Sequence, residues 1–286
     1  MMSMDDKKWS TIIKPKNKLW DIDFIELWRY RDLYTLFVKR DIVTQYKQTV
    51  LGPLWFFIQP LLTTLMYMVV FGGIAGISTD GLPQPLFYLS GILCWQYFSE
   101  CLNKTSTTFT ANQAIFGKVY FPRLVVPLAT VTSNLIRLGI QLLLLIIVYV
   151  YYLSFTDFSF SVNWTLCLFP ILIVLLAFLA LGFGILISSM TTKYRDMTVL
   201  FTFIIQLWMY ATPIIYPLST IKNPNIYMLM TLNPVTGIVE AFKYSVLGVG
   251  EFSWTLLGYS IGFMTILMVV GIVVFNRVQR SFMDTV

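Results

Sequence analysis

The sequence has no histidine and few charged residues. Histidine is the side chain that most often acts as a general base near neutral pH, and it is the commonest metal ligand. Its absence argues against hydrolytic and zinc-dependent chemistry in this chain. Asp, Glu, Lys and Arg together make up 12% of the 286 residues, about half the share of a typical soluble domain. So few charges cannot cover a water-facing surface.

Cysteine is also scarce, and the common nucleotide-binding motif is missing. The three cysteines give no disulfide framework, because Cys94 and Cys101 lie two helical turns apart on one hydrophobic segment and Cys167 is alone on another. The phosphate-binding loop Gly-x-x-x-x-Gly-Lys-Ser/Thr is missing too, since Gly117-Lys118 lacks the upstream glycine and the hydroxyl. We therefore expect no metal and no cofactor in this chain.

Apolar residues make up 57% of the sequence, and they fall into long runs. Crossing a hydrocarbon core of about 30 Å takes about 20 apolar helical residues. The sequence therefore predicts an all-α membrane protein with six transmembrane helices. Residues 1–53 would form a cytoplasmic N-terminal segment, 54–275 the transmembrane domain and 276–286 a cytoplasmic tail. The six predicted spans are residues 54–77, 85–102, 133–155, 164–190, 198–216 and 254–275.

The positions of Lys and Arg predict the orientation, because positive residues near span ends stay in the cytoplasm. With both chain ends inside, the inside segments carry 17 of the 20 basic residues. Arg137 lies within the third predicted span. We expect it near the cytoplasmic end of that span, with its side chain extended toward the lipid headgroups. The alternative is that Arg137 holds an anionic group of a substrate.

Residues 24–46 place apolar side chains at helical spacing among basic ones, which predicts an amphipathic helix lying in the membrane plane. The alternative is a helix that packs on the transmembrane body. The polar stretch 103–125 ends in Lys118-Val119-Tyr120-Phe121-Pro122-Arg123. Its aromatic tip predicts a docking site for a cytoplasmic protein, with Tyr120 and Phe121 at the lipid interface as the alternative.

The longest extracytoplasmic connection, residues 217–253, contains two apolar pieces that are too short to span the membrane. Pro224 and Asn233-Pro234 mark their beginnings. We expect two short re-entrant helices that border a pathway, because backbone at that depth must be covered by protein or water.

Several of these motifs together resemble one family. They are, in order, Arg40-Asp41, Tyr46 to Trp55 with Gln59-Pro60, Lys118 to Arg123, Lys193-Tyr194-Arg195-Asp196, Pro213 with Tyr216-Pro217, and Asn233-Pro234. With these motifs the sequence resembles, from about Trp28 onward, the membrane subunits of Gram-negative O-antigen and capsular polysaccharide ABC exporters, the Wzm-type permeases.

The resemblance implies an inner-membrane protein that exports lipid-linked O-antigen, with capsular or teichoic-acid-like polymers as the alternative cargo. Two copies would surround a channel, and two cytoplasmic ATPase subunits would bind ATP and Mg²⁺; no nucleic-acid partner is expected. The implied ATPase contacts are Lys118, Tyr120, Phe121, Pro122, Arg123, Lys193 and Arg195. The implied periplasmic gate residues are Tyr216, Pro217, Asn233 and Pro234.

A sugar polymer offers hydroxyls and flat apolar faces, which aromatic rings contact well. The expected channel residues are Tyr67, Trp95, Tyr97, Trp208 and Tyr210. Two rival hypotheses stand beside this one. An ion-coupled carrier would need several ionisable residues within the spans, where only Glu100 and Arg137 are available. A metal-dependent glycosyltransferase would use Asp21-Ile22-Asp23.

Overall fold

The computed structural model describes residues 24–156, 164–194, 196–250 and 252–285. All regular structure within these ranges is helical, which confirms the expected all-α class. Asp21-Ile22-Asp23 and Arg195 lie outside the described residues.

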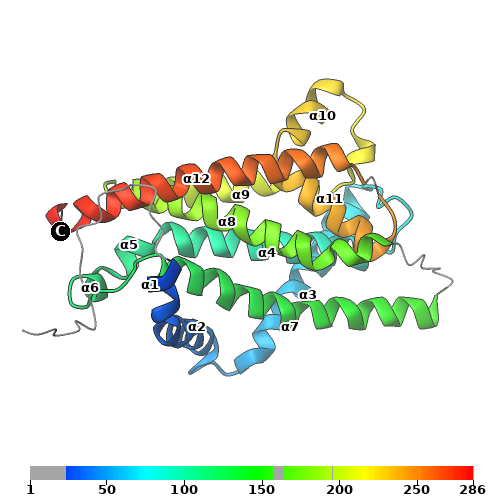
Figure 1. The fold of residues 1–286 in the computed structure, drawn as a ribbon. Helices are drawn as coiled ribbons and strands as arrows, with labels where there is room; N and C mark the ends of the chain where they lie inside the picture. The colour runs from blue at the N-terminus through cyan, green and yellow to red at the C-terminus, as the bar shows by residue number, and fades with distance from the viewer. Residues whose placement is uncertain (1–23, 157–163, 195, 251, 286) are drawn as a thin grey trace, which may run out of the picture.

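Four long helices form the body of the molecule: α4 (Gln84–Ser106), α7 (Val125–Phe155), α8 (Phe169–Thr191, after the 3-10 turn Trp164–Leu168) and α12 (Trp254–Thr285). Figure 1 shows them side by side along one axis in the order α12, α8, α4, α7. A Cβ atom added to Gly184 of α8 would lie 2.5 Å from the Thr105 side chain of α4. Small residues allow this close approach, as is typical of helices that associate in lipid.

The first apolar segment is an interrupted helix. It begins with the 3-10 turn Gly52–Leu54, continues as α3 (Trp55–Tyr67) and ends as the π-helix Met68–Ile74. Pro60 lies inside α3, where proline removes one backbone hydrogen bond, and π-helical turns frequently occur at functional sites. One side of α3 packs on α4 and α7, and the other side leaves leucines exposed.

Within the described part of the chain, four segments have both the length and the apolar composition to cross a membrane: Gly52–Ile74, Val125–Phe155, Trp164–Thr191 and Trp254–Gln279. The other two expected spans correspond to α4 and to α9 (Met197–Tyr210). α4 has 23 residues, enough to cross, but it carries polar residues and is enclosed by other helices. α9 has 14 residues, about 21 Å, which is short for a span. The six-span layout and its orientation therefore stay predictions.

The helices differ most from the predicted spans at three places, in α7, α9 and α12. α7 begins at Val125 instead of residue 133, because its first residues are buried against the body and Pro127 lies in the first turn, where its missing N–H costs nothing. α9 ends at Tyr210 instead of residue 216, since Pro213 cannot continue a helix. α12 continues past residue 275 without a break.

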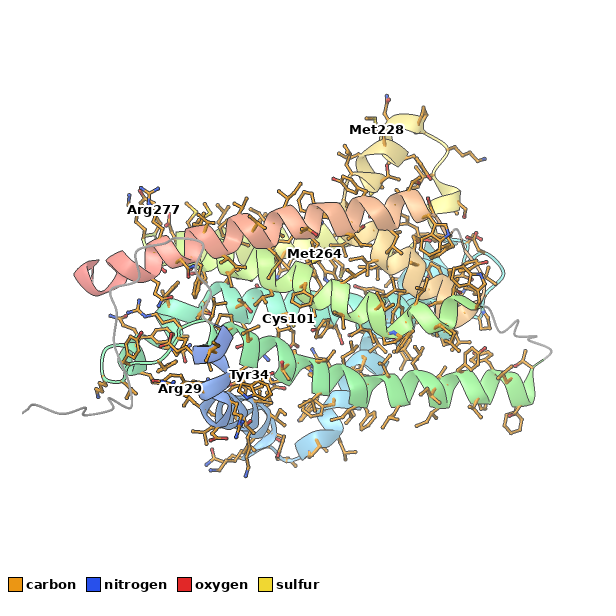
Figure 2. All side chains as sticks on the ribbon, viewed as in Figure 1. Arg29, Tyr34, Cys101, Met228, Met264 and Arg277 are labelled. Atoms are coloured by element: carbon orange, nitrogen blue, oxygen red, sulfur yellow. The ribbon has the colours of Figure 1, made fainter. Side chains whose placement is uncertain are left out.

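The N-terminal segment forms two helices, α1 (Phe24–Arg29) and α2 (Arg31–Tyr46). α2 packs on α7 through the buried Phe37 and Val38, as the alternative hypothesis expects, while its position relative to lipid stays a prediction. Figure 2 places Arg29 and Arg277 toward one end of the bundle and Met228 toward the other. The arrangement agrees with a topology that keeps both chain ends on one side.

Short helices cover both ends of the bundle. Beyond α9 lie the 3-10 turn Leu218–Thr220, α10 (Pro224–Thr231) and α11 (Pro234–Leu247). At the opposite end, α5 (Thr108–Ala111) and α6 (Gln113–Phe116) connect α4 to α7 (Figure 1). Two helices thus lie between α9 and α12 as expected, while their re-entry into the membrane and their place beside a pathway stay predictions. α11 is buried among α4, α8 and α12, whereas α10 projects from the body.

Candidate functional site

Three of the five expected channel residues pack against other helices of the bundle, two of them buried and Trp208 half-buried. Trp95 and Tyr97 of α4 are buried. Trp208 of α9 lies edge-on to Phe183 and Phe98, with ring centroids 5.1 and 5.4 Å away, and its ring is 6.4 Å from that of Trp95. These rings fix α9 against α4 and α8. Other helices thus cover these three rings within a single copy of the chain, and the channel role of the five residues stays a prediction.

Tyr210 and Tyr67 occupy a different environment. Tyr210 is 55% exposed at the end of α9. Tyr67, at the end of α3, is half-buried and donates a hydrogen bond to the Sδ atom of Met209 at 3.3 Å. This contact brings α3 and α9 together, and both helices present exposed apolar faces beside it. The exposed residues include Leu61, Leu62, Leu65 and Met66 on α3, and Val199, Leu200, Phe203 and Leu207 on α9.

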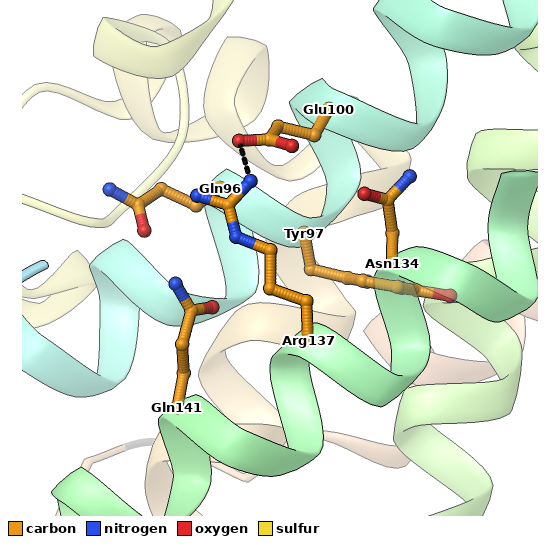
Figure 3. Close-up of a pocket in the computed structure, with 6 residues that line it drawn as sticks. All are labelled: Gln96, Tyr97, Glu100, Asn134, Arg137 and Gln141. Carbon is orange, nitrogen blue, oxygen red and sulfur yellow. Dashed lines mark hydrogen bonds and ion pairs between the residues drawn. The ribbon is translucent and has the colours of Figure 1, made fainter. Parts of the chain in front are cut away.

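A polar cluster lies between α3, α4 and α7 (Figure 3). Arg137 of α7 forms an ion pair with Glu100 of α4 and donates to Gln59 of α3 at 2.9 Å. Lys104 lies 3.3 Å from the other Glu100 oxygen and 3.1 Å from the amide oxygen of Asn134. The Arg137 side chain is 13% exposed. The expectation that Arg137 extends toward headgroups is therefore wrong, because a carboxylate within the bundle pairs with it.

The end of α9 is held by side chains from the short helices. The Asn233 amide donates to the Ala211 carbonyl and to the Thr212 hydroxyl, both at 2.9 Å, and its oxygen accepts from Val235 N at 3.0 Å. Asn233 therefore caps the start of α11 and satisfies a carbonyl at the end of α9. Pro234 provides the first residue of α11, where proline is favoured.

Two further residues complete this corner, here called the α9–α11 corner (residues 210–217, 233, 234 and 243). The Tyr216 hydroxyl lies 2.8 Å from the Tyr210 carbonyl and 3.3 Å from the Met230 Sδ. Buried Lys243 of α11 donates to the Pro213 carbonyl at 2.5 Å and lies over the Phe87 ring. The four expected gate residues thus come together, whereas the sequence analysis missed Lys243; a lysine and the nearby Glu240 within a largely apolar segment were the available signal.

The expected ATPase contacts divide by exposure. Lys118, Tyr120 and Lys193 are exposed, with Tyr120 at 60%. Phe121 is only 4% exposed, because its ring packs against Phe37 and Phe116. The expectation that Phe121 forms a bare tip is therefore wrong.

The last two residues of that motif anchor the loop to the body. Pro122 is half-buried. Arg123 donates to the Gln279 carbonyl of α12 at 2.7 Å, and partial burial lowers the pKa of its guanidinium. Exposed Val119 and Tyr194 lie beside the expected contacts, and the sequence analysis did not select them.

Long apolar helices packed in this manner define a multi-pass membrane protein. Residues 32–247 match the family described as ABC-2 type transporter, and the chain belongs to that family. The chain is 28% identical to the O-antigen export system permease protein RfbA of Myxococcus xanthus over 76% of this chain and 81% of the relative. It is 28% identical to the protein of that name from Klebsiella pneumoniae over 88% and 94%. It is also 24% identical to the polysialic acid transport protein KpsM of Escherichia coli over 86% and 93%.

Proposed function

We propose that this chain is the membrane subunit of an ABC exporter that moves lipid-linked O-antigen polysaccharide across the inner membrane. The similarity to O-antigen export permeases along nearly the whole chain carries the proposal. Capsular polysaccharide is the alternative cargo, because the chain is also similar, at lower identity, to a polysialic acid transport protein. ATP and Mg²⁺ would be bound by two partner subunits.

The pathway for the polymer would form where two copies of the chain meet. α3 and α9 both present exposed apolar faces in one copy, and Tyr67 and Tyr210 lie near the place where these two helices touch. Aromatic rings contact the apolar faces of sugars while their hydroxyls hydrogen-bond. Tyr67 and Tyr210 are therefore the favoured channel residues, and the α9–α11 corner is the favoured gate.

The ATPase would dock at the end of the bundle that carries α5 and α6. Val119, Tyr120 and Lys118 are exposed there, and Lys193 and Tyr194 are exposed in the loop after α8. Buried Phe121 packs against Phe37 of α2 and so holds the loop in place. The exposed residues of the loop would therefore be presented to the ATPase in a fixed position.

Deleting the gene in the organism that encodes the chain tests the function. We expect surface polysaccharide to disappear while lipid-linked polymer accumulates inside the cell, and a plasmid copy to restore export. Chemical analysis of the accumulated polymer and of its lipid would identify it as O-antigen or capsule. Normal surface polysaccharide in the deletion strain would refute the proposal.

A further inference from the structure

A hollow of about 380 Å³ lies between α2, the end of α4, α5 and the start of α7. Ligand sites in proteins usually have volumes of about 300–1,000 Å³, so this space is large enough for a small polar group. Its lining is rich in hydroxyl and amide groups, among them Thr44, Gln45, Asn112 and Thr130. These side chains are suited to hydrogen-bonding a hydrated or phosphorylated ligand.

Two cations reach the hollow from different helices. Arg40 belongs to α2 and Lys104 to the last turn of α4. Among the described residues that line the hollow, Asp41 supplies the only carboxylate. One oxygen of Asp41 accepts both of its hydrogen bonds from Arg40, at 2.8 and 2.9 Å. The walls of the hollow therefore carry one more positive than negative charge.

The neighbouring polar cluster does not remove that surplus. Lys104 is near Glu100, but Glu100 also pairs with Arg137. Arg40, Lys104 and Arg137 thus face two carboxylates, Asp41 and Glu100. The Arg40 and Lys104 side chains are 38% and 39% exposed, so an anion can reach both of them from outside the bundle. An anionic ligand that enters the hollow would balance the remaining positive charge.

The position of the hollow points to an anion that is attached to lipid. α2 crosses the end of the bundle beside α7 (Figure 1), and the exposed Trp28 and Leu36 lie on α1 and α2. Where α2 lies in the membrane plane, as the sequence predicts, these two residues would meet the lipid headgroups. Arginine is also the side chain best suited to bind phosphate with two parallel hydrogen bonds.

We propose that this hollow binds the phosphate-bearing headgroup of the lipid that carries the polysaccharide, before the polymer enters the channel. The proposal rests on the proposed function and adds a recognition site to it. Arg40 and Lys104 contact the phosphate oxygens. The hydroxyl and amide groups of Thr44, Gln45 and Asn112 lie where they can meet the first sugar.

Protection from a thiol reagent tests the site on the purified transporter, with its ATPase bound. Cys94 and Cys101 are buried, so only the exposed Cys167 must be replaced, by Ser. A cysteine placed at Gln45 then reports on the hollow. We expect farnesyl diphosphate to slow its labelling at least about fivefold at saturation. Farnesol and inorganic pyrophosphate alone should protect far less. Equal protection by pyrophosphate would overturn a lipid-linked ligand, and equal protection by farnesol would overturn phosphate recognition.

The matched variants are Arg40→Gln and Lys39→Gln. Both remove one positive charge from α2, but Lys39 is exposed and does not line the hollow. Because a charge-assisted hydrogen bond contributes about 1.5–3 kcal/mol, Arg40→Gln should raise the farnesyl diphosphate concentration for half-protection about tenfold or more. Lys39→Gln should leave it within about twofold. Equal effects of the two variants would refute the site.

Two controls distinguish headgroup binding from ATPase docking and from misfolding. Arg40→Gln should still co-purify with the ATPase; loss of the ATPase would identify the hollow as a docking surface and overturn the proposal. If Arg40→Gln fails to fold, Lys104→Gln makes the same test from α4. The gene deletion and the labelling experiment can give different answers. If the deletion abolishes surface polysaccharide but farnesyl diphosphate does not protect position 45, the headgroup site is refuted and the exporter function still stands.

Discussion

Arg137 of α7 forms an ion pair with Glu100 of α4 inside the helix bundle, and the same guanidinium reaches Gln59 of α3. One side chain therefore connects three helices. The pair is a weak source of net stability, because both ions lose water when they are buried. It nevertheless specifies how the three helices align, since breaking it leaves a charge without a partner.

We predict that Glu100→Gln destabilises the protein more than Arg137→Gln. The first change leaves both Arg137 and Lys104 without their shared carboxylate, whereas after the second change Glu100 keeps Lys104 at 3.3 Å. An unsatisfied buried group costs about 1–3 kcal/mol, and Glu100→Gln should reach the upper part of that range. Thermal unfolding in detergent measures the difference, with the exposed Arg277→Gln as control. The opposite order would contradict the shared-carboxylate geometry.

Trp208→Ala should reduce stability by about 3 kcal/mol, because it removes a ring packed against Phe98, Phe183 and Trp95. Tyr210→Ala should leave the unfolding temperature within about 1–2 °C, since surface changes are usually within ±0.5 kcal/mol. It should slow export of polysaccharide instead. Quantitative detection of surface polysaccharide, set against the amount of protein in the membrane, separates the two effects. A strong loss of stability in Tyr210→Ala would show that its ring is a packing residue.

Phe121→Asp should lower the amount of folded protein, because a carboxylate would be buried between Phe37 and Phe116. Tyr120→Ala should preserve folding and weaken binding of the ATPase. Co-purification of the ATPase with each variant makes the comparison. Wild-type ATPase binding by Tyr120→Ala, also after Val119→Ala is added, would exclude this loop from the docking surface.

Asn233→Ala and Asn233→Asp separate the two tasks of one side chain. Asp keeps the oxygen that caps α11 but loses the amide that donates to Ala211 and Thr212. Loss of the cap typically costs about 1 kcal/mol. We expect Ala to be the less stable variant in thermal unfolding, and both variants to alter export because the α9–α11 corner is no longer fixed. Normal export by both would remove Asn233 from the gate.

The sequence predicted those features that depend on local composition. Long apolar runs placed most helices, and Asn233-Pro234 marked the start of α11. Contacts between distant segments could not be predicted in this way. Arg137 and Glu100 lie 37 residues apart on different helices, so no local pattern pairs them. Phe121 was expected to be exposed for the same reason, since Phe37, which helps to cover it, lies far away in the sequence on α2. The buried Lys243 was missed because its partner carbonyl is 30 residues away.

The most direct measurement of the central proposal is photo-cross-linking in exporting cells. A photoreactive phenylalanine analogue is placed at Tyr210, and in a matched strain at Trp208, two positions earlier on the same helix. The account predicts that irradiation attaches a ladder of polysaccharide to the protein labelled at position 210 and none to the protein labelled at 208. Cross-linking at position 210 should stop when the ATPase is inactivated. Cells that export normally but give no polysaccharide adduct at position 210, or give equal adducts at both positions, would contradict the proposal that the exposed end of α9 borders the polysaccharide pathway.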